Sequence, residues 1–120
     1  MSSHEIEQQL LKEIIGEELS SVEFVQDYLQ LRFNGPCLTA VTQPTIATGE
    51  RILVWNEPSY RDELCNQIGH KVKAVDIHAG EYVEVVLDDD VVIRISLKDS
   101  DYRTAEAAKF DSSAGEWWVI

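Results

Sequence analysis

Basic side chains, cysteines, prolines and long hydrophobic runs are all scarce in this chain of 120 residues. Lys and Arg together number 10 against 22 Asp and Glu, which sets the net charge near −12. Nonspecific binding to nucleic acid or to an anionic membrane depends on clustered Lys and Arg, so we expect neither partner. No stretch approaches the roughly 20 apolar residues that cross a bilayer as a helix. The acidity permits a basic protein partner, or serves solubility alone.

The N-terminus and the cysteines predict a cytoplasmic protein. The opening stretch MSSHEIEQQLLKEIIGEE is charged throughout and lacks the apolar segment of a signal peptide. Cys37 and Cys65 are expected to be unpaired thiols, buried as small hydrophobic residues. With 44% hydrophobic residues, the chain suits a single folded domain over residues 1–120.

Two stretches of the chain repeat each other. LLKEIIGEELSSVEF (10–24) aligns without a gap on ELCNQIGHKVKAVDI (63–77), 53 positions further on. After one inserted residue, YLQLRF (28–33) aligns on YVEVVL (82–87). We therefore predict two pseudo-repeats, over about residues 3–56 and 58–120, that pack as a pseudo-dimer because neither half can bury its apolar face alone.

Each repeat is predicted to open with a helix. The first helix would start at a capping box in Ser2–Glu5 and the second at Pro58-Ser59. Gly16 and Gly69 would end them, because glycine adopts the left-handed conformation of a helix C-terminus at little cost. The apolar stripes assigned to these helices are Ile6, Leu10, Leu11, Ile14 and Ile15 in the first and Leu64, Cys65 and Ile68 in the second.

After each glycine, the pattern predicts a strand and then a β-hairpin. Leu19 is out of phase with the apolar alternation that follows it, and Val72 is out of phase in the same way, which indicates a bulge or a late strand start. Alternating apolar residues then predict inward faces on the hairpin strands. The inward residues are Leu29, Leu31 and Phe33 in one copy, and Val83, Val85, Leu87, Ile93, Ile95 and Leu97 in the other.

Short strands at 52–56 and 116–120 are predicted to close the two halves. Between the hairpins and these strands, residues 43–51 are expected to form a loop, and residues 98–115 a longer one with a helical turn at 104–109. The fold class expected is α+β, an antiparallel sheet or barrel-like sandwich with two helices.

Motifs of catalysis and metal binding are not found. His4, His70 and His78 show no metal-ligand spacing to one another or to a cysteine. Asp88, Asp89 and Asp90 stand where the first repeat has Asn34-Gly35, so a polar turn is expected rather than a calcium loop. Neither a nucleophile motif nor a glycine-rich phosphate loop is present. We predict no metal, no cofactor and no catalytic residue.

Two Tyr-Arg pairs and a Trp pair are the candidate contact residues. Tyr and Arg are the types that anchor protein interfaces, although both pairs can also serve packing and local ion pairs. Adjacent Trp residues on a strand point to opposite faces, so one can fill the core while the other needs a second cover, which a homodimer would provide. The residues are Tyr60, Arg61 and Asp62, then Asp101, Tyr102, Arg103 and Glu106, and finally Trp117 and Trp118.

Three motifs resemble those of a family of small bacterial proteins whose activity is uncharacterised. They are WNEPSYRDELCNQIG (55–69), SLKDSDYRTAEAAKF (96–110) and the closing EWWVI (116–120). The resemblance runs from about Gly16 to the C-terminus and implies a small standalone soluble domain. It transfers no activity, cofactor or catalytic residue.

Three hypotheses for function follow. The first is a non-catalytic binding module, self-associating or inhibiting a basic partner in the manner of a toxin-immunity protein. Its acidic site would form if the hairpin tip 88–90 and the loop residues Asp99 and Asp101 lie together beside Tyr102 and Arg103. The second is a small-molecule binding domain with a pocket between the two repeats. The third is an enzyme of unrecognised type.

Overall fold

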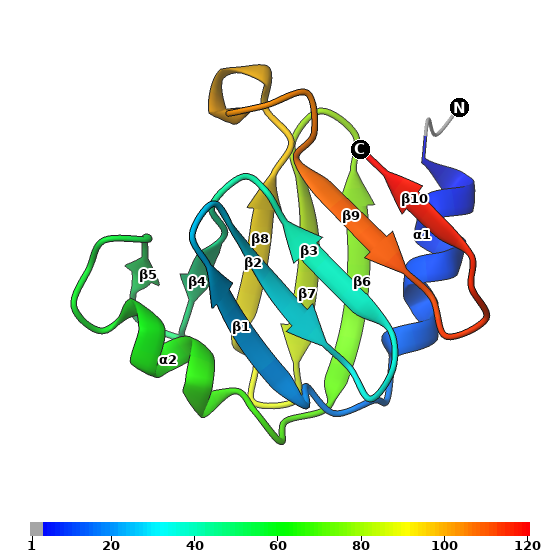
Figure 1. The fold of residues 1–120 in the computed structure, drawn as a ribbon. Helices are drawn as coiled ribbons and strands as arrows, with labels where there is room; N and C mark the ends of the chain where they lie inside the picture. Colours follow the sequence, from blue (N-terminus) through cyan, green and yellow to red (C-terminus); the bar gives the residue numbers. More distant parts are fainter. Residues whose placement is uncertain (1–3) are drawn as a thin grey trace.

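The computed structural model describes residues 4–120 as two five-stranded antiparallel sheets that face each other (Figure 1). Sheet 1 consists, in spatial order, of β1 (Ser21–Val25), β2 (Tyr28–Arg32), β3 (Cys37–Ala40), β9 (Ala108–Asp111) and β10 (Trp117–Val119). Sheet 2 consists of β5 (Ile52–Leu53), β4 (Thr45–Ala47), β8 (Val92–Ser96), β7 (Tyr82–Leu87) and β6 (Val72–His78).

The two halves of the chain exchange their last strands. The first half builds the meander β1-β2-β3 and then sends β4 and β5 to the other sheet, where β4 pairs with β8. The second half builds β6-β7-β8 and sends β9 and β10 to sheet 1, where β9 pairs with β3. The predicted pseudo-repeats are confirmed, and the exchange explains why neither half is complete without the other.

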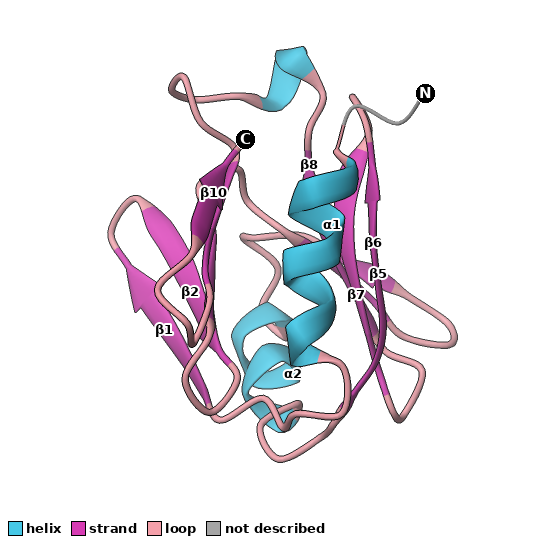
Figure 2. Cartoon of the chain, turned by 90° about the vertical axis from the view of Figure 1, so that its right-hand side faces the viewer, coloured by secondary structure: helices cyan, strands magenta, loops and turns pink. Residues whose placement is uncertain are grey.

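The two helices occupy opposite open sides of the sandwich. α1 (Glu5–Leu11), extended by the 3-10 turn η1 (Lys12–Ile14), packs on β6, while α2 (Tyr60–Asn66) packs on β1 and β4. Figure 2 shows both helices lying in the space between the two sheets. Each helix therefore covers the first strand of the other half, which repeats the exchange made by the strands.

The predicted inward faces are confirmed. Leu31 and Val85, at equivalent places in the two hairpins, are 0% and 1% exposed. The buried residues of both halves form one continuous cluster. The predicted irregularity is present in both copies, because β1 begins only at Ser21 and β6 has a register shift between Val72 and Ala74.

Both glycine assignments are confirmed. Gly16 follows η1 with a φ of +87°, and Gly69 follows α2 with a φ of +96°. The Gly16 amide donates to the Val72 carbonyl, and the Gly69 amide donates to the Leu19 carbonyl. The two helix ends are thus hydrogen-bonded to each other's half. The predicted Ser2-Ser3 cap lies outside the described residues, and no side-chain cap is made at His4 or Ser59.

Three expectations about the connections and helix faces are wrong. Residues 45–47 of the expected loop form β4, because Thr45–Ala47 find a partner strand in the other half. The expected helical turn at 104–109 gives way to β9, and the short helix η2 (Asp99–Asp101) lies earlier in the same segment. The buried face of α2 is Tyr60, Leu64 and Gln67, while Cys65 and Ile68 are exposed. On α1 and the residues that follow it, Ile6 and Ile15 are exposed as well.

Candidate functional site

An unbroken row of apolar side chains crosses the outer face of sheet 2. The strand registers place one residue of each strand in this row, from one edge of the sheet to the other. In spatial order its members are Ala74 on β6, Val86 on β7, Val92 on β8, Ala47 on β4 and Ile52 on β5. We call this set the apolar row.

The apolar row faces away from the core. Val85 and Ile93, beside it in the sequence, are buried, and successive residues of a strand point to opposite faces. Ile52 is 66% exposed and Ala74 is also exposed, while the three residues between them are half-buried by their neighbours. An uninterrupted apolar line on a solvent-facing sheet surface marks a contact site more often than scattered apolar residues do.

The equivalent row of sheet 1 is polar. Pairing of its strands places Ser21, Arg32, Cys37, Asp111 and Trp117 in one line, in the same order of strands. Arg32 of this row binds Glu23. The backbone of the fold therefore accepts charged residues on this row, and the apolar residues of sheet 2 are not a requirement of the fold.

A charged row borders the apolar row on sheet 2. Arg94 binds Glu84 at 3.0 Å and lies over the ring of Tyr82, 4.5 Å from its centroid. His78 contacts Asp76 at 2.8 Å and stacks on the same Tyr82 ring. These polar neighbours contact one another and give the apolar row a polar margin, as in protein interfaces.

A shallow hollow lies at the far end of this outer face. It measures about 240 Å³ and opens beside the ends of β7 and β8. Tyr82, Arg94 and Ser96 form its floor, with Lys98 and Asp101 at the side. The Asp101 carboxylate accepts a hydrogen bond from Ser96, which ties η2 to this end of β8.

The predicted acidic residues 88–90 form the turn between β7 and β8 and are held by cations. His70 Nδ1 lies 2.7 Å from Asp88, and Lys73 Nζ lies 2.7 Å from Asp90. The hydrogen bond with Asp88 raises the pKa of His70, and the same bond lowers the pKa of Asp88. His70, Asp88 and Asp89 bring ligand atoms within 4.8 Å of one another, the only such group in residues 4–120. Asp88 and Asp89 lie on the exposed turn and half-buried His70 lies just before β6, and the contacts of His70 with the two carboxylates account for the geometry.

The two acidic regions do not meet. Residues 88–90 precede β8, whereas η2 (Asp99–Asp101) follows it, so the strand separates them. Figure 1 shows the β7–β8 turn and the η2 loop at opposite ends of the sheet. The concentrated negative field expected beside Tyr102 and Arg103 is therefore not formed by these two regions.

The first Tyr-Arg pair belongs to the packing of α2. Tyr60 is fully buried, its hydroxyl donates to the Pro44 carbonyl at 2.6 Å, and burial raises its pKa. The Arg61 guanidinium lies 5.1 Å from the Phe24 ring and 5.7 Å from the Trp55 ring. These contacts fasten α2 to β1 and to the segment after β5.

The second Tyr-Arg pair lies in the connection between η2 and β9. Tyr102 is half-buried against the core, and this burial raises the pKa of its hydroxyl. Arg103 is exposed and, with Asp101 and Trp55, lines an open hollow of about 270 Å³. Glu106 is exposed in the same connection and its amide donates to Thr104.

The two closing Trp residues point to opposite faces, as predicted. Trp118 is 5% exposed and packs on Phe110, with ring centroids 5.8 Å apart. Trp117 is 63% exposed, and Lys109 lies over its ring. On the outer face of sheet 1, Trp117 thus stands at the end of a row that contains charges.

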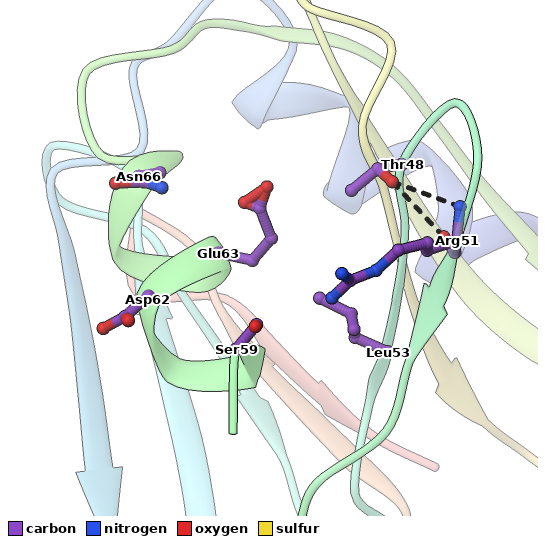
Figure 3. Close-up of a pocket in the computed structure, with 7 residues that line it drawn as sticks. All are labelled: Thr48, Arg51, Leu53, Ser59, Asp62, Glu63 and Asn66. Atoms are coloured by element: carbon purple, nitrogen blue, oxygen red, sulfur yellow. Dashed lines mark hydrogen bonds between the residues drawn. The ribbon is translucent and has the colours of Figure 1, made fainter. Parts of the chain in front are cut away.

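A polar pocket lies between α2 and the β4–β5 hairpin, drawn in Figure 3. It measures about 370 Å³, with Asp62 and Glu63 on the helix and Arg51 on the hairpin opposite. Leu53 is its only aliphatic lining residue. A much smaller void beside Leu29 and Pro44 measures about 10 Å³, roughly one water.

No family model, curated protein or solved structure matches the chain. No helix within residues 4–120 is long and apolar enough to cross a membrane. The resemblance in the three motifs accordingly remains a prediction.

Sequence patterns contained a signal for the apolar row. Val85-Val86, Val92-Ile93 and Ile52-Leu53 are apolar doublets within strands, and in each doublet one member must face outward. The same reasoning identified Trp117-Trp118. What the sequence could not show is that the outward members of separate doublets, together with Ala47 and Ala74, form one line.

Proposed function

We propose that this protein is a non-catalytic protein-binding module whose contact surface is the outer face of sheet 2. The observation that carries the proposal is the apolar row. At two of the equivalent places, those of Val86 and Ala47, sheet 1 has the charged residues Arg32 and Asp111. Apolar residues without charge among them, bordered by paired charges, match the arrangement of an interface, in which a charge-depleted centre lies within a polar margin.

Small-molecule binding has less support. An apolar ligand needs an enclosed, mostly apolar cavity, and the void beside Leu29 and Pro44 holds about 10 Å³. The larger pocket at Arg51, Asp62 and Glu63 is open and polar. A basic protein remains a candidate partner, although Asp88 and Asp90 are already paired with cations.

The test transfers the sheet 1 pattern to sheet 2. In the variant Ala47→Asp/Val86→Arg, both residues take the identity found at the equivalent places in sheet 1, so the fold should accept them. The matched control is Arg32→Val, which removes a charge from the outer face of sheet 1. Each protein is immobilised and used to capture partners from a cell lysate.

We expect proteins that are retained by the wild type and by Arg32→Val to be lost from the double variant. Retention of the same proteins by all three would contradict the assignment of this face. Repeating the capture at high salt separates apolar from charge-driven binding, because salt screens exposed charges.

A further inference from the structure

We infer that the partner covering the apolar row is a second copy of this chain, with the two apolar rows packed against each other. This inference rests on the proposed function and names the occupant of the same face. It predicts a symmetric dimer in which two sheets 2 meet face to face, about 10 Å apart as in other sheet packings.

Local charge favours a second copy. The chain carries a net charge near −12, so two copies repel each other over most of their surface. Around the apolar row, however, Glu84 is paired with Arg94, Asp90 with Lys73, and Asp76 lies against His78. The carboxylates nearest the row thus have partners within the chain, and it is a place where two copies can approach without bringing unpaired carboxylates together.

Symmetry also separates the remaining charges. A twofold axis along the apolar row sets each row on the other, so that Ile52 meets the partner's Ile52. The same axis carries the two charged rows to opposite sides of the interface. Arg94 of one copy then does not face the partner's Arg94 but lies on the side of the partner's β7–β8 turn, which carries Asp90.

The available area fits a weak dimer. The five strands lie about 4.8 Å apart and range from two residues in β5 to seven in β6, so they present a face on the order of 400 Å² per copy. Together the two faces bury less than the roughly 1,000 Å² of specific, stable interfaces. We therefore expect a weak, concentration-dependent dimer with a Kd on the order of 10 μM or higher rather than a permanent one.

Salt distinguishes this occupant from a basic protein. Screening reduces the repulsion between two acidic copies, so the dimer should tighten as ionic strength rises. A complex with a basic partner is held by attraction between opposite charges and should weaken under the same change.

The first experiment is sedimentation equilibrium from about 1 μM to about 1 mM, a range that brackets the expected Kd. We expect a monomer–dimer equilibrium for the wild type and for Arg32→Val. In Ala47→Asp/Val86→Arg the Kd should rise roughly 100-fold or more, because the twofold axis would set each introduced charge against the same charge of the other copy. Ile52→Asp, at an exposed member of the row on the edge strand, is a second variant that leaves the sheet interior unchanged.

The second experiment tests the geometry by cross-linking. In a Cys65→Ser background, which removes the exposed native thiol, Ile52→Cys should be joined to its copy by a bismaleimide reagent whose spacer spans the roughly 10 Å between facing sheets. The matched control is Trp117→Cys, at the equivalent place in sheet 1 with 63% rather than 66% exposure. We expect it to stay monomeric on the same gel.

A monomer at every concentration would overturn self-association, while the capture experiment would still decide whether sheet 2 binds another protein. A dimer that persists in both row variants would show that a different surface is used. Cross-linking through Trp117→Cys alone would assign that surface to the edge of sheet 1, the interface predicted from the two closing Trp residues.

Discussion

The rows through Val92 and Cys37 occupy the same place in the two halves, and they differ in chemistry on three of their five strands. In sheet 1 the row contains Arg32 and Asp111, which water solvates readily. In sheet 2 the row is apolar on all five strands. Backbone pairing and the shared core constrain only the inward residues, which are apolar in both halves. The outward residues are free to differ, so their difference reports on contacts outside the fold.

The largest losses of stability should come from truncating core residues, and they should be similar on the inward faces of the two sheets. Leu31→Ala and Val85→Ala truncate equivalent core residues, at expected costs of about 3 and about 2 kcal/mol, because each leaves a cavity. Chemical denaturation should show one transition for both variants, since the halves share a single core. Gln30→Ala, on the outer face, is the control with little effect. Separate transitions for the two halves would contradict the exchanged architecture.

The next comparison concerns the paired glycines. Gly16→Ala and Gly69→Ala should each cost about 1 kcal/mol, because both residues have positive φ. An added Cβ would meet no atom within 4 Å at either place, so the cost is backbone conformation alone. Gly49→Ala, where the backbone is not left-handed, should be nearly neutral in thermal denaturation. Unequal losses at the two glycines would show that the helix ends are not equivalent.

Introducing the two charged residues of sheet 1 into the apolar row should change the free energy of unfolding little. Ala47→Asp/Val86→Arg should keep the free energy of unfolding within about 1 kcal/mol of the wild type, because both positions are on the outer face. The arginine introduced at position 86 would have Asp76 as a neighbour. Asp76 lies relative to position 86 as Glu23 lies relative to Arg32 in sheet 1. Circular dichroism and denaturation check this. A large loss would mean that the apolar row supports the fold itself, and the argument for an interface would fall.

The smallest expected difference between the two halves is a pH dependence of stability, which comes from a pair in the second half. The pKa of His70 is raised chiefly by its hydrogen bond to Asp88, so the pair stabilises the fold below about pH 6.5. This contribution is lost as pH rises through the raised pKa of His70. Because the pKa of Asp88 is lowered, its carboxylate contributes stability above the ordinary pKa of Asp. This contribution is lost as pH falls through the lowered pKa of Asp88.

Asp88→Asn tests this pair by introducing the residue type that the first half has at the equivalent position, Asn34. The pKa of His70, followed by NMR titration, should return toward its ordinary value in the variant. The accompanying loss of stability between mildly acidic and neutral pH should shrink, although both groups are exposed and the effect is modest. An unchanged pKa of His70 would show that the pair does not persist in solution.

Much of the fold was predictable from local pattern. The alternation in β2, β7 and β8 identified the inward faces, and Gly16 and Gly69 marked the helix ends, because both signals act within a few residues of the chain. β4 and β9 were missed, since residues 45–47 and 108–111 are short and become strands through partners from the other half. Cys65 was expected to be buried because Leu64 is, whereas the position of β1 and β4 turned Tyr60 and Gln67 inward instead.

By itself the sequence determined the two repeats, the residues that enter the core and the outward turn of one member of each apolar doublet. It could do so because helix and strand periodicities belong to the chain. Only the tertiary structure decided the exchange of hairpins, the separation of the acidic turn 88–90 from η2, and the alignment of Ala74, Val86, Val92, Ala47 and Ile52 into one row. Those features depend on which strands pair and in which register, and pairing joins residues that are far apart in sequence.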